Sequence, residues 1–220
     1  ISGRRTGTGV TGLGDCLAAL SVTYGSEDSV KLTEEIYKSL ALNTYRESVK
    51  MAKERGTFEV FSYEKEKAHP FISKVMELDK DLKHGWKKYG RRNISITTTA
   101  PAGSVSTLTQ TTSGIEPAFL LEYTRRRKIN PDDTNVTVDF VDQNGDSWHE
   151  YDIRHHGVNL WRNATGKEDI EESPYYNSTT DKIDWLSSVD VQAAAQKWVC
   201  HSISKTCNFP NETPKEVVAE

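Results

Sequence analysis

Near the middle of the chain, an alternating pattern gives way to a helical one around a single proline. Positions 94 to 99 read Ile-Ser-Ile-Thr-Thr-Thr, an alternating and largely β-branched run that predicts a strand. Pro101 ends this strand, because proline has no N–H for further pairing. Val105 and Leu108 are three positions apart, which predicts a short helix with Gly114 as its stop.

A strand followed by a small-residue turn and a helix N-terminus is a geometry that holds anions. The first turn of a helix leaves backbone N–H groups unpaired, and the helix dipole places partial positive charge there. Small side chains let a phosphate approach this backbone, and serine hydroxyls can donate further hydrogen bonds. The candidate phosphate-binding residues are Ala102, Gly103, Ser104, Val105 and Ser106. The alternative is an ordinary turn in which Ser104 caps the helix, and the local pattern alone favours that alternative.

The clearest predicted helix covers residues 26 to 56. Acidic residues gather toward its start and basic residues toward its end, an order that complements the helix dipole. Ser26 or Ser29 can cap its start, and Gly56 follows its last turn. The apolar stripe that we expect it to bury consists of Leu32, Ile36, Leu40 and Ala41. We interpret this helix as structural.

Apolar spacing predicts two further helices and one more strand. One short helix is expected over residues 71 to 82 from Phe71, Val75, Leu78 and Leu82. A second helix, capped by Ser187 or Ser188, precedes a strand predicted over residues 203 to 209. The residues expected to pack on this second helix and just after it are Val191, Ala194, Ala195, Trp198 and Val199.

The glycine-rich N-terminal segment has two interpretations. Gly7, Gly9 and Gly12 match the Gly-x-Gly-x-x-Gly pattern of dinucleotide-binding folds. We reject that interpretation, because no predicted strand precedes the glycines and no acidic residue follows at the end of a second strand. We expect instead that the glycines allow close packing against neighbouring backbone. The helix after them should present one apolar face, formed by Leu13, Leu17 and Leu20.

Residues 131 to 160 have the pattern of a β-hairpin. Alternating apolar residues lead into Asn144-Gly145, a strong hairpin sequence, and an aromatic-rich run returns over 148 to 153. Residues 131 to 180 are therefore expected to be a hairpin and surface insertion within one domain, 1 to 220. Neighbouring histidines point to different sides of a strand, so we expect no shared metal at His149, His155 and His156.

Charge and cysteine content argue against several classes of protein. The formal net charge of −4 gives no global basic field for nucleic acid. No run approaches the roughly 18 apolar residues of a membrane span. Three cysteines without a Cys-x-x-Cys pair disfavour a zinc site or a disulfide framework and favour a reducing, cytoplasmic compartment. For Cys16 we expect a buried, inert thiol.

Two basic runs each have more than one interpretation. Arg91 and Arg92 are expected to be solvated, with a salt bridge at the entrance of the predicted strand as the alternative. Residues 125 to 128 read Arg-Arg-Arg-Lys and are expected to be a solvated run. The alternatives for that run are that it raises the local potential for anionic substrates or pairs with buried carboxylates.

Three groups of motifs follow one another from near the start of the chain to near its end. Residues 4–14 read Arg-Arg-Thr-Gly-Thr-Gly-Val-Thr-Gly-Leu-Gly. Residues 100–106 read Ala-Pro-Ala-Gly-Ser-Val-Ser, followed by Ser-Gly-Ile-Glu-Pro at 113–117 and Tyr-Thr-Arg-Arg at 123–126. Residues 202–210 read Ser-Ile-Ser-Lys-Thr-Cys-Asn-Phe-Pro. Together they resemble the large, catalytic subunit of ribonucleotide reductase, and the last motif is most similar to the adenosylcobalamin-dependent (class II) enzymes.

This resemblance implies a fold, a reaction and a set of partners. The fold implied is α/β, the second half of a ten-stranded α/β barrel with a β-hairpin insertion. The complete enzyme would convert ribonucleotides to deoxyribonucleotides by thiyl-radical chemistry for DNA synthesis, with adenosylcobalamin and an external dithiol reductant. In the family the turn that matches residues 102 to 106 contacts the substrate phosphates. The partners implied are the ribonucleotide and the N-terminal half of the reductase with its catalytic cysteines, and a homodimer is compatible with the resemblance.

The radical chemistry itself has no counterpart in the chain. The family's Asn-x-Cys-x-Glu segment is absent, and Cys16, Cys200 and Cys207 lack Glu and Asn in that arrangement. We therefore assign no catalytic residue and no metal ligand, and expect a reductase fragment that is inactive alone. The alternatives are a non-catalytic nucleotide-binding regulatory module of the same fold, a class I oxygen-dependent large subunit, or a structural half-barrel with open edges.

Overall fold

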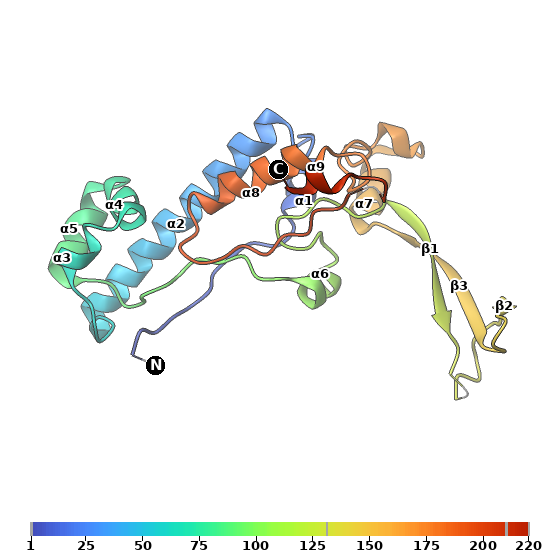
Figure 1. Ribbon diagram of the computed structural model, residues 1–220, viewed down its shortest axis with the longest axis horizontal. Coiled ribbons are helices and arrows are strands. Elements are labelled where there is room, and N and C mark those ends of the chain that lie inside the picture. The colour runs from blue at the N-terminus through green and yellow to red at the C-terminus, as the bar shows by residue number, and fades with distance from the viewer. Residues whose placement is uncertain (1, 131, 210, 220) are drawn as a thin grey trace.

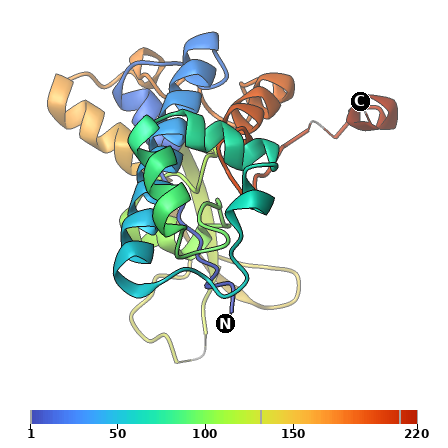
Figure 2. The ribbon, with the colours of Figure 1, turned by 90° about the vertical axis from the view of Figure 1, so that its left-hand side faces the viewer.

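The computed structural model describes residues 2–130, 132–209 and 211–219. Its helices are α1 (Leu13–Ala19), α2 (Glu27–Arg55), α3 (Tyr63–Glu66), α4 (Pro70–Glu77), α5 (Lys80–Tyr89), α6 (Gly103–Thr109), α7 (His156–Thr165), α8 (Trp185–Gln196) and α9 (Lys215–Ala219), with a 3-10 helix η1 (Ile170–Glu172). The strands are β1 (Glu122–Lys128), β2 (Phe140–Val141) and β3 (Ser147–Arg154). Helix α2 crosses the molecule, with α3 to α5 at one end and the strands projecting at the other (Figure 1). Helix α9 lies apart from the other helices (Figure 2).

Helix α2 begins and ends where the sequence predicts. The Ser26 hydroxyl accepts a hydrogen bond from the Ser29 N–H (3.2 Å), and Gly56 follows the last turn with φ of 77°. The predicted apolar stripe packs against the core, with Ala41 fully buried and Leu32, Ile36 and Leu40 partly buried. The most deeply buried row lies beside it and includes Ser29, Thr33, Tyr37, Ala41 and Tyr45. This face is selected because the Tyr37 hydroxyl hydrogen bonds the Thr99 hydroxyl at 2.7 Å on the central extended segment.

The predicted strand at 94–99 is extended but forms isolated bridges instead of a continuous ladder. It pairs in parallel with the N-terminal segment at Thr8 and with the C-terminal segment at Ile203 (Figure 1). Backbone hydrogen bonds between 2.7 and 3.1 Å join the three segments. The strand predicted over 203–209 is therefore corrected to an extended segment with a bridge at Ile203 alone among its described residues.

One side chain explains why the central pairing is interrupted. The Cys200 thiol accepts hydrogen bonds from the N–H groups of Ile96 (3.2 Å) and Thr97 (3.3 Å). The Cys200 N–H in turn donates to the Thr97 hydroxyl at 2.9 Å. Because each backbone N–H donates to one principal acceptor, these groups are not available for a regular ladder.

The three parallel segments are covered by helices, which gives an α/β arrangement. One buried cluster joins Leu17, Tyr37 and Val191 from α1, α2 and α8, and a second joins Tyr45 and Trp86 from α2 and α5. The described residues contain one three-stranded antiparallel sheet and no closed barrel. None of their helices is both long and apolar enough to span a membrane.

Two glycines of the N-terminal segment confirm the prediction of close packing. A Cβ at Gly9 would lie 2.0 Å from the Thr98 carbonyl oxygen, and one at Gly14 would lie 2.7 Å from the Glu116 carbonyl oxygen. Real Cβ atoms essentially never approach backbone so closely, so both positions exclude a side chain. The glycines thus bring the N-terminal segment and α1 against the stretch around α6.

The predicted hairpin is part of a larger sheet with strand order β1-β3-β2. The turn at Asn144-Gly145 is confirmed, with Gly145 at φ of 83°. The main partner of β3 is β1, however, which pairs with it from Glu122↔Arg154 to Lys128↔Trp148. The basic run was not predicted as a strand, because its side chains are all exposed and so show no apolar alternation.

The structure corrects two helix predictions, in each case because an aspartate caps the start of a helix. The single helix expected over 71–82 is two helices, because Asp79 accepts hydrogen bonds from the N–H groups of Asp81 (2.7 Å) and Leu82 (3.2 Å) and starts α5. Helix α8 begins after Asp184, whose carboxylate accepts from the Ser187 N–H, and not after Ser187 or Ser188. Its predicted packing residues are confirmed as buried.

Burial differs from expectation at four places. Cys16 is exposed, not buried, and Leu20 lies outside the apolar face of α1, because the helix ends at Ala19. Arg91 is buried beneath Tyr45, Phe58 and Trp86 and pairs with Glu66, so the salt-bridge alternative is confirmed for it. The expected surface segment is not superficial throughout, since its buried residues include Ser173, Tyr175, Ser178 and Thr179.

Candidate functional site

The turn before α6 is placed by the central extended segment. Residues 94–99 are hydrogen bonded on both sides, and Pro101 then turns the chain into α6. Ala102 occupies the N-cap position with φ of −110° and offers no side-chain cap. Ser104 lies inside the helix, so the alternative in which Ser104 is the cap is wrong. The helix ends at Gln110, whose φ is 57°, and not at Gly114.

The first turn of α6 exposes backbone that an anion can approach. The first helical hydrogen bond runs from the Ser106 N–H to the Ala102 carbonyl at 2.7 Å. The N–H groups of Gly103, Ser104 and Val105 precede it and have no acceptor within the helix. A Cβ at Gly103 would meet nothing within 4 Å, so the space in front of this turn is open.

The serine side chains of α6 contribute unequally. Ser106 is buried, and its hydroxyl donates to the Gly103 carbonyl at 2.8 Å. Ser104 is exposed, and its hydroxyl is on the open first turn. The apolar residues Val105 and Leu108, used to predict the helix, are exposed as well. Of the five candidate residues, the structure brings Gly103, Ser104 and Val105 together as an accessible turn, while both the amide and the hydroxyl of Ser106 are engaged.

The loop after α6 is held by the start of α1. The Asp15 carboxylate accepts hydrogen bonds from the Thr112 N–H (2.6 Å) and the Tyr175 hydroxyl (2.8 Å). The Thr11 hydroxyl donates to the Thr112 carbonyl (3.1 Å) and accepts from the Gly114 N–H (3.1 Å). These contacts fix the C-terminal end of α6, and sequence reasoning missed them because they join positions 97 to 160 residues apart.

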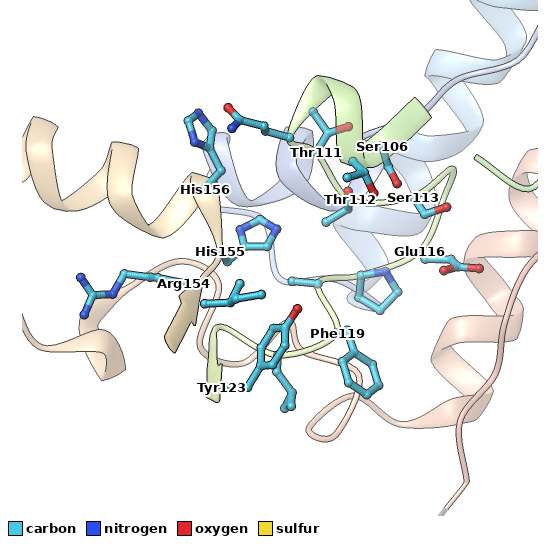
Figure 3. A pocket seen from close by; sticks show the side chains of 16 residues that line it. Ser106, Thr111, Thr112, Ser113, Glu116, Phe119, Tyr123, Arg154, His155 and His156 are labelled. Atoms are coloured by element: carbon cyan, nitrogen blue, oxygen red, sulfur yellow. The ribbon is translucent and has the colours of Figure 1, made fainter. Parts of the chain in front are cut away.

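A cavity of about 390 Å³ is lined by this loop, by α6 and by residues 153–156. Thr112, His155 and Tyr123 are arranged around it in Figure 3. Burial lowers the pKa of His155, and the nearby charge of Asp15 opposes that shift only in part. Among the described residues, no three His, Cys, Asp or Glu side chains are grouped so that they could hold a metal ion.

The Cys200 thiol lies among hydrogen-bond donors. Burial raises the pKa of the Cys200 thiol, but the hydrogen bonds it accepts from the Ile96 and Thr97 N–H groups and hydroxyl donors outweigh that effect and lower its pKa to about 7. A thiolate is therefore stabilised within the fold. Sequence reasoning missed this because the donors are more than 100 residues away.

The structure is thus an α/β body that exposes a hydroxyl-bearing turn after a buried extended segment. Comparison with known proteins gives the family. The profile described as "Ribonucleotide reductase, barrel domain" matches residues 2–220, and the chain belongs to this family.

Three similar proteins agree with this family. A vitamin B12-dependent ribonucleoside-diphosphate reductase of Mycobacterium tuberculosis is 33% identical over 122 residues, which cover 56% of this chain and 15% of that protein. A protein of the same name from Thermoplasma acidophilum is 26% identical over 218 residues, 98% of this chain and 26% of that protein. The ribonucleoside-diphosphate reductase large subunit of Ostreid herpesvirus 1 is 24% identical, over 99% of this chain and 28% of that protein. The chain thus spans between 15% and 28% of the length of these relatives.

Proposed function

We propose that this chain is part of a ribonucleotide reductase and supplies the turn that binds the substrate phosphates. The observation that carries the proposal is the open first turn of α6, where Gly103, Ser104 and Val105 present unpaired N–H groups. The helix dipole adds partial positive charge at the same place. The Ser104 hydroxyl supplies a further donor, and Ala102 and Ser106 shape the ends of the turn.

The complete enzyme would remove the 2′-hydroxyl of a ribonucleotide, in the ten-stranded barrel that the family resemblance implies. The relatives from Mycobacterium and Thermoplasma are named as acting on ribonucleoside diphosphates with vitamin B12. We therefore propose adenosylcobalamin as the cofactor, with an external dithiol as reductant and the cytoplasm as location. We propose that the complete enzyme binds this cofactor.

The remaining reductase is also the proposed partner of this chain. It would supply the catalytic cysteines, because none of Cys16, Cys200 and Cys207 lies in an Asn-x-Cys-x-Glu segment. A homodimer of the assembled enzyme is compatible with this proposal. Within the chain, the segment 131 to 180 is proposed to be the insertion that varies most from the rest of the family.

The test is reconstitution with a matched pair of variants. The chain is combined with a polypeptide that supplies the rest of the reductase, adenosylcobalamin, a dithiol and a ribonucleoside diphosphate, and deoxyribonucleotide is measured. Gly103→Leu places a bulky side chain in the open space before the turn, and we expect nucleotide affinity to fall at least about tenfold, the loss of a charge-assisted hydrogen bond. Ala164→Leu is the control, since it also places a bulky side chain at an exposed position but lies on α7.

Four outcomes separate the candidates. Product that requires both polypeptides, with weaker nucleotide binding by Gly103→Leu, supports a reductase with its phosphate site at α6. Nucleotide binding without product in any combination supports the non-catalytic regulatory module instead. Product only with a separate radical-generating subunit and without adenosylcobalamin supports the class I alternative. Unchanged nucleotide affinity in Gly103→Leu overturns the phosphate site.

A further inference from the structure

Several hydrogen-bond donors converge on the sulfur atom of Cys200. The N–H groups of Ile96 and Thr97 donate to it at 3.2 and 3.3 Å, and the Thr97 hydroxyl lies 3.4 Å away. The Ser95 hydroxyl is 3.8 Å from the same atom. Donors that point at one atom stabilise negative charge there, so this arrangement favours the thiolate form of Cys200.

One further group beside this sulfur has an unused hydrogen. The Tyr45 hydroxyl is fully buried, lies against Cys200 and has no hydrogen-bond partner of good geometry among the described residues. Burial, with Cys200 as the next cause, raises the pKa of Tyr45, so the hydroxyl stays protonated and able to donate. Because a buried donor without an acceptor is costly, an additional acceptor atom on the sulfur would be stabilised here.

A small reactant can approach the sulfur from solvent. Cys200 is partly exposed, and a cavity of about 560 Å³ opens next to it between the three parallel segments. Ser95, whose hydroxyl lies near the sulfur, lines this cavity, and so does His201, the residue after Cys200. A molecule the size of hydrogen peroxide fits such a space.

We propose that Cys200 is a modification site at which a hydroperoxide oxidises the sulfur to a sulfenic acid, with the Tyr45 hydroxyl donating to the added oxygen. The thiolate attacks the terminal peroxide oxygen, so that an S–O bond forms as the O–O bond breaks. The sulfur loses two electrons and the peroxide gains them. The remaining alkoxide or hydroxide leaves and takes a proton from water, which gives Cys–S–OH and an alcohol or water. This reactivity does not depend on the function proposed for α6.

The first test compares two cysteines within the unaltered 220-residue chain. The chain is treated with hydrogen peroxide and a 1,3-diketone that traps sulfenic acids, and mass spectrometry follows the label on each cysteine. Cys16 is the internal control, because it is the more exposed of the two. We expect Cys200 to be labelled about tenfold faster at pH 7, where an ordinary thiol is only a few per cent thiolate. The rate at Cys200 should reach half of its maximum at about pH 7.

Unfolding the chain is the control for the donors around the sulfur. In concentrated urea both cysteines lose their surroundings, so their labelling rates should agree within about twofold. A preference for Cys200 that persists in urea overturns the proposal. Labelling of Cys16 as fast as that of Cys200 in the folded chain overturns it as well.

A second test addresses the Tyr45 hydroxyl. Tyr45→Phe removes it and keeps the ring that stacks on Trp86, and circular dichroism verifies the fold. When the trap is added at increasing delays after peroxide, we expect the sulfenic acid to disappear about fivefold faster, the effect of one lost hydrogen bond. Tyr37→Phe is the matched control, because it removes another buried hydroxyl of α2 that contacts Thr99 instead. An unchanged lifetime in Tyr45→Phe, or an equal loss in Tyr37→Phe, overturns the role of Tyr45.

Discussion

The helical body and the projecting β1-β3-β2 sheet are stabilised by different forces. In the body, α2 and α5 bury Tyr45 and Trp86 completely, and their rings stack with centroids 5.2 Å apart. In the sheet, every residue of β1 is exposed. Its strands are joined by backbone pairing and by ion pairs across the surface, such as Arg126 with Glu150 at 2.6 Å.

This difference predicts where a substitution lowers the free energy of unfolding most. A fully buried aromatic side chain contributes several kcal/mol through burial and packing. An exposed ion pair contributes about 0–1 kcal/mol, because water and salt screen it and two long side chains lose freedom. The same kind of substitution should therefore have a large effect in the body and a small one in the sheet.

The largest effect is expected from Trp86→Ala. This change removes the ring that stacks on Tyr45 and leaves a cavity, so the free energy of unfolding should fall by about 4 kcal/mol. Urea unfolding of the full chain measures it. Leu108→Ala is the control, because Leu108 is 85% exposed and its loss should be nearly neutral. A loss below about 1 kcal/mol in Trp86→Ala would show that the body is not packed as described.

A somewhat smaller loss is expected from Glu66→Gln. Glu66 neutralises Arg91, whose side chain is only 4% exposed, and also accepts from the Trp86 indole N–H at 2.8 Å. Removing one charge of a buried pair leaves the other uncompensated and should cost about 3 kcal/mol. Glu150→Gln removes an exposed partner of the same kind and is the matched control. Equal losses in the two variants would contradict the contrast between body and sheet.

A third prediction concerns pH and Cys200. Its pKa is about 7 in the folded chain, compared with an ordinary value of 9.0, so the thiolate stabilises the fold. A lowered folded-state pKa gives stability that is fully present above pH 9 and is lost as the pH falls through 7. Because the thiol is only partly buried and solvent screens part of the effect, the free energy of unfolding should rise by about 1 kcal/mol from pH 7 to pH 9, relative to Cys200→Ser. Urea unfolding of both proteins at the two pH values measures this, and parallel pH dependence would argue against a thiolate.

The smallest effect is expected from Arg126→Ala on β1. Its ion pair with Glu150 is exposed, so the free energy of unfolding should change by less than about 1 kcal/mol at low salt. The change should shrink further in 0.5 M salt, because exposed charges are screened. Urea unfolding at two salt concentrations tests this. A loss as large as that of Trp86→Ala would mean that the sheet is part of the core.

Local sequence chemistry predicted the elements that local contacts stabilise. Helix α2 has its serine cap and its glycine stop at the predicted positions, and the turn at Gly145 has the backbone conformation that Asn-Gly favours. The extended segment, the proline turn and the short helix around α6 were predicted in the right order. These features depend on residues a few positions apart, so their physical causes are readable in the chain itself.

Long-range contacts could not be predicted in this way. The sequence gives no sign that Asp15 would meet both Thr112 and Tyr175, or that the Cys200 thiol would accept the amides of a segment more than 100 residues away. Strand β1 was missed because its partner β3, and not an apolar pattern, keeps it extended.

The sequence by itself thus determined the limits of α2, the turns at Pro101 and Gly145, and the family to which the chain belongs. Only the tertiary structure decided that Arg91 is buried, that Cys16 is exposed, and that the Cys200 thiol lies among hydrogen-bond donors. The reason is physical. Capping and turn formation are set by backbone geometry over a few residues, whereas burial and charge environment depend on which distant segments pack together.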